Sequence, residues 1–327
     1  MQKSAFSAAC LSISAALLLA ACNSPPADES TAAQPSAPAT EQAAPPDQPE
    51  TPPPPASAAS LATGNLDQVL AGSWRSDAEK ARDQYRHPKQ TLDFFGLKPD
   101  MTAVEITPGG GWYAEILAPF LNAGGHYVAA VAKPSKPDGE AAKQNAALRA
   151  KFAADPTQYG NAKVIEFDPK APNFGPSGSA DMVVTFRNIH NWVAAGTAPA
   201  MFKAFFDVLK PGGILGVTDH RAAPGSDVKK TEHSGYLPQD YVESLATGAG
   251  FKLADQSEIN ANAKDTRDHE KGVWTLPPTL TLGDKDKAKY LAIGESDRMT
   301  LKFVKPKGDQ IFEQGADHTG KAADGTK

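Results

Sequence analysis

Cysteine is scarce in this sequence of 327 residues. The only two, Cys10 and Cys22, stand near the N-terminus, so no disulfide or cysteine-based metal site is open to the chain that follows. Aromatic residues make up 8% while there are 28 prolines, which indicates that part of the chain does not pack into a core. The formal net charge is −5, and a chain without excess positive charge is not expected to bind nucleic acid.

Two motifs of well-known catalytic loops are also missing. The sequence has no Gly-x-Ser-x-Gly turn of a serine hydrolase and no Gly-x-x-x-x-Gly-Lys-Ser/Thr phosphate loop. It has no internal repeat either. The function therefore has to be sought in the motifs that are present.

Residues 1–21 have the features of a lipoprotein signal peptide. Lys3 supplies a positive charge, and Ala5–Leu19 is an apolar run too short to span a membrane comfortably. Its end, Leu19-Ala20-Ala21-Cys22, resembles the lipobox of bacterial lipoproteins, which implies cleavage before Cys22 and lipidation of that residue. The alternative is an ordinary secretory peptide cut nearby. Because Asn23 and not Asp follows the cysteine, we expect a lipid anchor in the outer membrane, facing the periplasm.

Residues 22–60 are expected to form a disordered linker. Residues 23–60 contain eleven prolines, five acids and no base, and such a composition cannot bury enough apolar surface to fold. Removing these five negative charges and the positive charge of Lys3 from the total of −5 leaves −1 for residues 61–327. The folded domain is therefore expected within residues 61–327 and to be nearly neutral.

Within that domain, strands alternate with helices. Strands are predicted at Thr102–Ile106, Tyr127–Ala132, Val164–Phe167, Asp181–Phe186, Ile214–Thr218 and Phe251–Glu258. Helices are predicted at Trp112–Leu121, Gly139–Phe152, Ala198–Leu209 and Pro238–Gly248. This alternation predicts an α/β fold with a doubly wound, mostly parallel sheet. The alternating pattern of Arg298–Val304 predicts an antiparallel edge strand.

Residues 64–96 are predicted to form N-terminal helices, 97–258 the core, 259–310 an excursion with the edge strand, and 311–327 a flexible tail. The first helix is predicted over Leu66–Tyr85, with an apolar side and with Arg75, Lys80, Arg82 and Arg86 on its remaining surface. A short second helix follows at Pro88–Gly96.

The stretch Ala103–Tyr113 joins a predicted strand to a predicted helix through three glycines. Such a turn brings backbone N–H groups and the positive end of a helix close to a ligand. Glycine suits the turn because a Cβ would obstruct the ligand or forbid a positive φ. Dinucleotide-binding turns and purely structural turns share this pattern, so alone it does not identify the ligand.

The order of three motifs resembles that of the class I S-adenosylmethionine-dependent methyltransferases, specifically a family of predicted bacterial methyltransferases. The motifs are Glu105–Gly111, Ala180–Trp192 and Leu209–Val217, and the resemblance covers roughly residues 65–305. It implies a Rossmann-like methyltransferase fold and S-adenosylmethionine as the cofactor. The cofactor-binding residues that it implies are Glu105, Thr107, Gly109, Gly110, Gly111, Asp168 and Arg187, with Thr107 at the position of the family's first glycine.

One position departs from the pattern of that superfamily. Its second strand usually ends in an acid that binds the ribose hydroxyls, whereas this one ends Val131-Ala132-Lys133. Asp138 or Glu140 is the nearest acid in the loop that follows. Asp168 matches the position that often binds the adenine amino group, and a solvated acid before Pro169 is the alternative.

The catalytic residues are expected at the carboxyl ends of the fourth and fifth strands, where open α/β sheets bind ligands. His190, His220 and Asn188 are the candidates, and an imidazole near neutral pH could serve as a base. Each histidine could instead shape its loop through hydrogen bonds. Asp219 and His220 with His233 could also ligate a metal, but the twelve residues between His220 and His233 fit no spacing that we trust, and we expect none.

These observations predict methyl transfer from S-adenosylmethionine to a small-molecule acceptor. The predicted location in the cell envelope argues against methyl transfer, because the cofactor is made in the cytoplasm. The alternative is a non-catalytic ligand-binding or envelope-assembly lipoprotein on the same fold, since fold alone does not decide function. A nicotinamide-dependent oxidoreductase also shares the glycine turn but lacks its ribose acid here. The sequence does not predict the oligomeric state.

Overall fold

The computed structural model describes residues 64–308. The predictions for the signal peptide, Cys22, the linker and the tail after residue 308 lie outside the described residues. No helix in the described part combines the length and the apolar character needed to cross a membrane.

A seven-stranded sheet in the order β3-β2-β1-β4-β5-β7-β6 organises the described chain. The strands are β1 (Thr102–Ile106), β2 (His126–Ala132), β3 (Ala162–Phe167), β4 (Ala180–Phe186), β5 (Leu209–His220), β6 (Lys252–Ser257) and β7 (Arg298–Val304). β7 runs antiparallel to both of its neighbours, and the pairings from β3 through β5 are all parallel. The predicted fold class, a mostly parallel Rossmann-like sheet with one antiparallel strand, is confirmed.

The antiparallel strand lies one place further in than its pattern indicated. β7 pairs with β5 on one side and with β6 on the other, so β6 forms the edge. The reason is that β7 is buried on both faces: Met299, Leu301 and Phe303 are fully buried, and Arg298 before them and Thr300 between them are buried as well. β6, by contrast, is exposed along almost its whole length. Alternation alone does not distinguish a strand with a solvated face from one whose polar face is covered.

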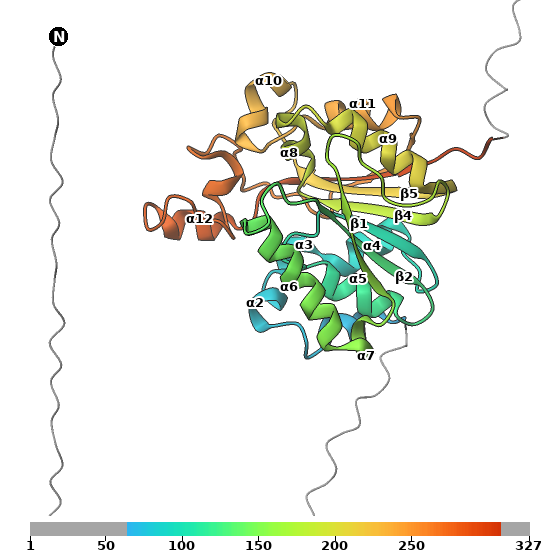
Figure 1. The fold of residues 1–327 in the computed structure, drawn as a ribbon. Helices are drawn as coiled ribbons and strands as arrows, with labels where there is room; N and C mark the ends of the chain where they lie inside the picture. Colours follow the sequence, from blue (N-terminus) through green and yellow to red (C-terminus); the bar gives the residue numbers. More distant parts are fainter. Residues whose placement is uncertain (1–63, 309–327) are drawn as a thin grey trace, which may run out of the picture. The chain divides into compact units, whose positions relative to one another are not determined.

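Helices cover both faces of the sheet. The helices of the described chain are α1 (Leu66–Ala71), α2 (Asp77–Lys80), α3 (Asp83–Arg86), α4 (Pro88–Phe95), α5 (Ala114–Leu121), α6 (Glu140–Ala154), α7 (Pro156–Tyr159), α8 (Ile189–Ala194), α9 (Ala198–Val208), α10 (Val228–Thr231), α11 (Gln239–Gly248) and α12 (Lys287–Ile293). One apolar cluster joins α8, α9 and α11 to the sheet, and a second joins α1 and α4–α7 to its other face. Figure 1 shows these two groups towards the top and the bottom of the view.

The prediction of a single N-terminal helix over residues 66–85 is wrong. The chain forms three short helices, because Gly72 ends α1 and Ser76 starts α2 with a capping box to Glu79. The turn between them directs Arg75 inward, where its guanidinium bonds the Leu70 carbonyl and the Asp83 carboxylate. The prediction that these arginines decorate an outer surface is therefore also wrong for Arg75 and Arg86, which are 2% and 5% exposed.

Candidate ligand site at the topological switch point

The strand order reverses between β1 and β4, and a cavity of about 340 Å³ lies at the carboxyl ends of these two strands. Open α/β sheets bind ligands at such a switch point. The cavity is lined by Glu79, Arg82, Arg86, Glu105, Thr107, Pro108, Gly109, Gly110, Trp112, Tyr113, Phe186, Arg187, Asn188 and Pro278. It therefore combines the glycine turn, the end of β4, the N-terminal helices and one residue of the excursion.

The glycine turn leaves backbone donors available at the cavity. The N–H groups of Gly109 and Gly110 donate to no acceptor within residues 64–308, whereas the N–H of Gly111 donates to the Pro108 carbonyl. Gly109 has a φ of +59°, and a Cβ at either Gly109 or Gly110 would meet no protein atom within 4 Å. The space beside these two glycines is open to a ligand.

Gly111 has a different role in the packing. Its φ is +87°, and an added Cβ would lie 3.2 Å from Cδ1 of Leu148 on α6. Gly111 is also not among the residues that line the cavity. Its glycine is explained by its backbone conformation and by the close approach of α6.

Thr107, which the resemblance places at the first glycine of the motif, has a left-handed backbone, with φ at +54°. This conformation is unusual for a β-branched residue. Its N–H bonds the Ala130 carbonyl at 2.8 Å, and its hydroxyl is buried without a hydrogen-bond partner among the described residues. Threonine at this position therefore keeps the shape of the turn but strains its backbone.

Glu105 is the buried acid of the site. It is 3% exposed, and one of its carboxyl oxygens accepts a hydrogen bond of 2.6 Å from the Tyr127 hydroxyl on β2. Burial raises the pKa of Glu105 from 4.5 to about 7, against the opposing effects of the Tyr127 hydrogen bond and the Arg86 charge. The second carboxyl oxygen is available to a donor in the cavity.

Aromatic rings form the wall at the start of α5. Trp112 and Tyr113 meet edge to face at 4.7 Å, and Tyr113 stacks on Phe186 at the end of β4. The Arg86 guanidinium lies 4.4 Å from the centre of the Trp112 ring, which is a cation–π contact. The Trp112 ring N–H donates to the Glu79 carbonyl. This wall joins α2 and α3 to the glycine turn.

Asn188 connects the ends of β1 and β4. Its amide nitrogen lies 3.0 Å from the Ile106 carbonyl, 3.2 Å from the Thr107 carbonyl and 3.2 Å from the Phe186 carbonyl. An amide has two hydrogens, so these acceptors share them. The contacts give Asn188, predicted as catalytic, a position from which it holds the glycine turn.

His190, which follows β4, lies close to Asp219 and His220 at the end of β5. The three are buried, and their ligand atoms lie within 4.8 Å of one another. His233, the third member of the metal ligand set considered from the sequence, lines a different cavity. The Asp219 carboxylate accepts from the His220 N–H at 2.7 Å and lies 3.2 Å from the His190 Nδ1.

The surroundings of His220 favour its neutral form. Its Nδ1 lies 2.5 Å from the Ser296 hydroxyl, and Arg187 Nε lies 3.4 Å from its Nε2. Burial and the Arg187 charge hold the pKa of His220 well below 6.5. A guanidinium in contact with this ring opposes both a proton and a metal cation there. His220 and His190 are not among the residues that line the cavity at the glycine turn.

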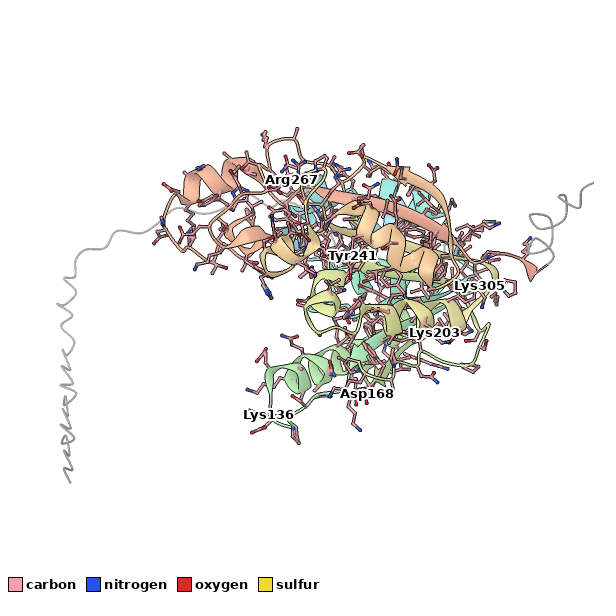
Figure 2. The ribbon with its side chains drawn as sticks, turned by 90° about the horizontal axis from the view of Figure 1, so that it is seen from above. Lys136, Asp168, Lys203, Tyr241, Arg267 and Lys305 are labelled. Atoms are coloured by element: carbon pink, nitrogen blue, oxygen red, sulfur yellow. The ribbon has the colours of Figure 1, made fainter. Side chains whose placement is uncertain are left out.

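The acids considered for the ribose and the adenine lie elsewhere. Asp138, Glu140 and Asp168 are exposed, and none of them lines the cavity. Asp168 accepts from the Lys170 N–H at 2.9 Å in a local turn. Figure 2 places Asp168 and Arg267 on opposite sides of the molecule.

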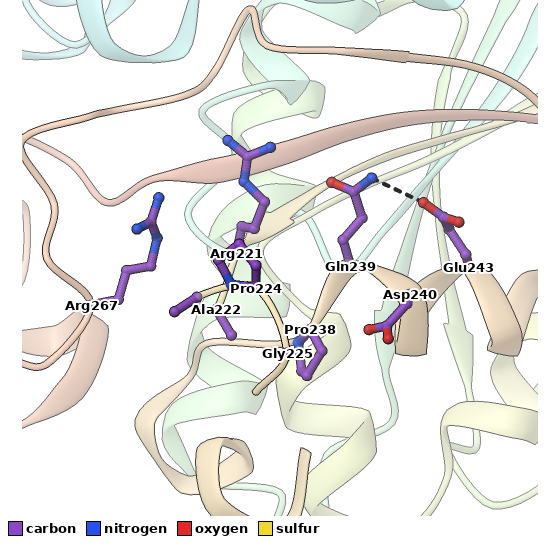
Figure 3. A pocket seen from close by; sticks show the side chains of 10 residues that line it. Arg221, Ala222, Pro224, Gly225, Pro238, Gln239, Asp240, Glu243 and Arg267 are labelled. Carbon is purple, nitrogen blue, oxygen red and sulfur yellow. Dashed lines mark hydrogen bonds between the residues drawn. The ribbon is translucent and has the colours of Figure 1, made fainter. Parts of the chain in front are cut away.

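A second cavity, of about 470 Å³, lies between the end of β5 and the start of α11. Figure 3 shows Arg221 and Arg267 on one side of it and Gln239, Asp240 and Glu243 on the other. Both arginines are bonded to carboxylates: Arg221 to Glu258 and Asp297, and Arg267 to Asp297. Its charged groups are thus largely satisfied within the protein.

No family model and no curated protein matches the sequence. Solved structures that are similar include a SAM-dependent methyltransferase from Aquifex aeolicus, at 14% identity over 74% of this chain and 98% of that chain, with a TM-score of 0.46. The [4+2]-cyclase SpnF has 16% identity over 73% and 85%, with a TM-score of 0.49. The glycopeptide N-methyltransferase MtfA has 13% identity over 71% and 100%, with a TM-score of 0.43. At these scores the fold assignment rests on this chain's own strand order and register.

Proposed function

We propose that this chain binds S-adenosylmethionine at the switch point and transfers its methyl group to a small-molecule acceptor. The observation that carries the proposal is the glycine turn, with the free N–H groups of Gly109 and Gly110 beside the buried Glu105. When bound, the cofactor supplies an electrophilic methyl group. The protein's own task is then to hold both molecules in line and to exclude water.

The donor set of the cavity suits the amino-acid end of this cofactor. Glu105 offers a carboxyl oxygen to an ammonium group, and that cation would draw the Glu105 proton off by favouring the charged form. Gly109 and Gly110 offer two N–H donors to a carboxylate. Arg187, which the resemblance assigns to cofactor binding, lines the same cavity.

A second candidate, a non-catalytic ligand-binding protein on this fold, is favoured by one observation. The cavity lining includes no residue of β2 or β3, and Lys133 stands where an acid would hold the ribose. Product formation separates the two candidates, because a binding protein would retain the cofactor unchanged.

Calorimetry of the full chain with the demethylated product, S-adenosylhomocysteine, tests cofactor binding. Gly109→Arg should abolish micromolar binding, because it fills the open space beside the turn. Gly178→Arg is the matched control: Gly178 also has a positive φ, at +67°, and open space, but lies away from the cavity. No heat and no thermal shift at millimolar ligand would sink the proposal.

The anchoring predicted at Cys22 completes the proposal. We propose that lipidation of Cys22 places the domain at the outer membrane, on a linker of residues 22–60. Labelling with a radioactive fatty acid tests this in a bacterial host, with Cys22→Ser as the variant that should lose the label. Retention of the label by Cys22→Ser would contradict it.

A further inference from the structure

Guanidinium groups in and beside the cavity at the switch point outnumber the carboxylates that pair with them. Arg82, Arg86 and Arg298 all contact one carboxylate, that of Glu295, at 2.8, 3.2 and 3.4 Å. These positive charges hold the pKa of Glu295 at about 2, in spite of its burial. Arg187 adds a fourth guanidinium whose charge acts on the same carboxylate.

Three of these arginines line the cavity and keep unused hydrogen-bond donors. Arg82 Nη2 is buried without a partner among the described residues. Within residues 64–308, the side chain of Arg86 hydrogen-bonds only through Nε to Glu295, and the side chain of Arg187 only through Nε to His220. Each therefore has terminal nitrogens that form no hydrogen bond with the described part of the chain.

Arg298 differs from the other three. Its Nε donates to the Ser296 carbonyl and its Nη2 donates to the Tyr85 carbonyl. It does not line the cavity. Arg298 thus supports Glu295 and takes no direct part in binding a ligand.

The remaining acids nearby do not balance the excess. Glu79 on the rim accepts from the Ser76 N–H and hydroxyl, and Asp219 accepts from the backbone N–H groups of Ile189 and His220. Glu105 is only partly ionised near neutral pH, since its pKa is about 7. Burial and the neighbouring arginines also lower the pKa of Arg86 to about 9. The guanidinium groups of the cavity repel one another, and a bound anion would reduce that repulsion.

We propose that Arg82, Arg86 and Arg187 form a receptor for an oxyanion, a carboxylate or phosphate group on a molecule bound in this cavity. Guanidinium groups suit such groups because their paired N–H donors match two oxygens at once. The anion has two possible sources. It is either the carboxylate of the cofactor's amino-acid end or an anionic group on the methyl acceptor, and this last step rests on the proposed function.

The test uses inorganic phosphate and succinate as probes, titrated into the full chain by calorimetry. Arg82→Gln and Arg187→Gln should each weaken binding of the probes at least tenfold. Arg149→Gln is the matched control, because Arg149 is an exposed arginine paired with Glu166 on β3, outside the cavity, and should leave binding unchanged. Urea unfolding identifies any variant that fails to fold. Arg86→Lys is then tested in place of that variant, because lysine keeps the charge but loses the paired donors.

Two further ligands distinguish the sources of the anion. S-adenosylhomocysteine carries the carboxylate, and 5′-methylthioadenosine lacks it. If Arg187→Gln weakens only the first of these, and phosphate competes with it, the cofactor supplies the anion. If phosphate binds to protein saturated with S-adenosylhomocysteine, and the arginine variants lose only phosphate, the acceptor supplies it.

Failure of this proposal differs from failure of the proposed function. Absence of phosphate and succinate binding, or equal binding by wild type and both folded variants, overturns the oxyanion receptor even where the cofactor binds. Binding of phosphate that depends on the arginines, without any binding of S-adenosylhomocysteine, upholds the receptor and removes the proposed function.

Discussion

The ring of Tyr113 lies parallel to the ring of Phe186, with centroids 3.5 Å apart and planes 8° apart. Tyr113 immediately precedes α5, after the glycine turn, and Phe186 ends β4, so the stack joins the two segments that flank the switch point. Both rings line the cavity. The stack therefore fixes the spacing between the glycine turn and the residues that follow β4.

Replacing Phe186 by Leu should loosen that spacing. Loss of the stacked pair is expected to lower the free energy of unfolding by about 1 kcal/mol, the usual contribution of an aromatic pair beyond buried area. Binding of S-adenosylhomocysteine should weaken as well, because the turn loses its support. Urea unfolding and calorimetry measure the two effects.

Phe206→Leu provides the comparison for this variant. Phe206 is also half-buried and packs edge to face on Phe251 at 5.1 Å, but it does not line the cavity. It should show a similar loss of stability with unchanged binding. Equal binding by Phe186→Leu and Phe206→Leu would show that the stack has no role in the site.

Asn188 should tolerate alanine better than aspartate. Asn188→Ala removes donors from the Ile106 and Thr107 carbonyls, and is expected to lower the free energy of unfolding by about 1–2 kcal/mol. Asn188→Asp places a carboxylate against the same oxygens and should cost more. Urea unfolding at pH 7 and pH 4 checks this, since the gap between the two variants should narrow when the introduced carboxylate is protonated. Equal free energies of unfolding of Asn188→Asp and Asn188→Ala at both pH values would contradict the contacts of the amide nitrogen.

The sheet was largely predictable because its strands carry local signals. β1 was predicted with its observed bounds, and β2, β3 and β4 within two residues at each end, from apolar runs bounded by turns. The position of β7 within the sheet was not predictable, because its polar face is covered by Tyr85 and Asn260, which are remote in the sequence. The three N-terminal helices had a local signal, the Ser76–Glu79 capping box, which the apolar pattern obscured.

The cavity was predictable only where it is built from contiguous motifs. Glu105, Thr107, Gly109 and Gly110 come from one stretch, and Arg187 and Asn188 from another, and all six line it. Arg82 and Arg86 were missed as site residues because their partner Glu295 lies 213 and 209 positions away, and only the folded chain brings them together. Asp168 illustrates the converse: the resemblance assigned it to adenine binding by its place in the sequence, but its side chain caps a local turn.

Thr107→Gly should stabilise the protein. The left-handed backbone of an L-residue costs roughly 1–2 kcal/mol, and glycine adopts it freely, although its greater freedom in the unfolded chain offsets about half of the gain. The buried Thr107 hydroxyl, which has no partner among residues 64–308, is removed as well. We expect a net gain of about 1 kcal/mol in urea unfolding. Thr102→Gly in the regular part of β1 should instead lose stability, and a loss in both would contradict the strain at Thr107.

The buried Glu105 should make stability depend on pH. Its pKa is raised from 4.5 to about 7 on folding, so the folded state binds its proton more tightly than the unfolded state does. The stability that this proton confers is fully present below pH 4.5, declines as the pH rises from there, and is lost as the pH passes 7. The decline attributable to this one group is on the order of 1–3 kcal/mol.

Glu105→Gln should remove that decline. Glutamine keeps an oxygen that accepts from the Tyr127 hydroxyl but does not titrate, so the variant should gain on wild type as the pH rises from 5 to 8. Urea unfolding at each pH gives the difference in free energy. Glu166→Gln is the control, because Glu166 is exposed and paired with Arg149, and it should follow wild type across the range. A constant difference between Glu105→Gln and wild type from pH 5 to 8 would mean that Glu105 keeps the pKa of an exposed carboxyl.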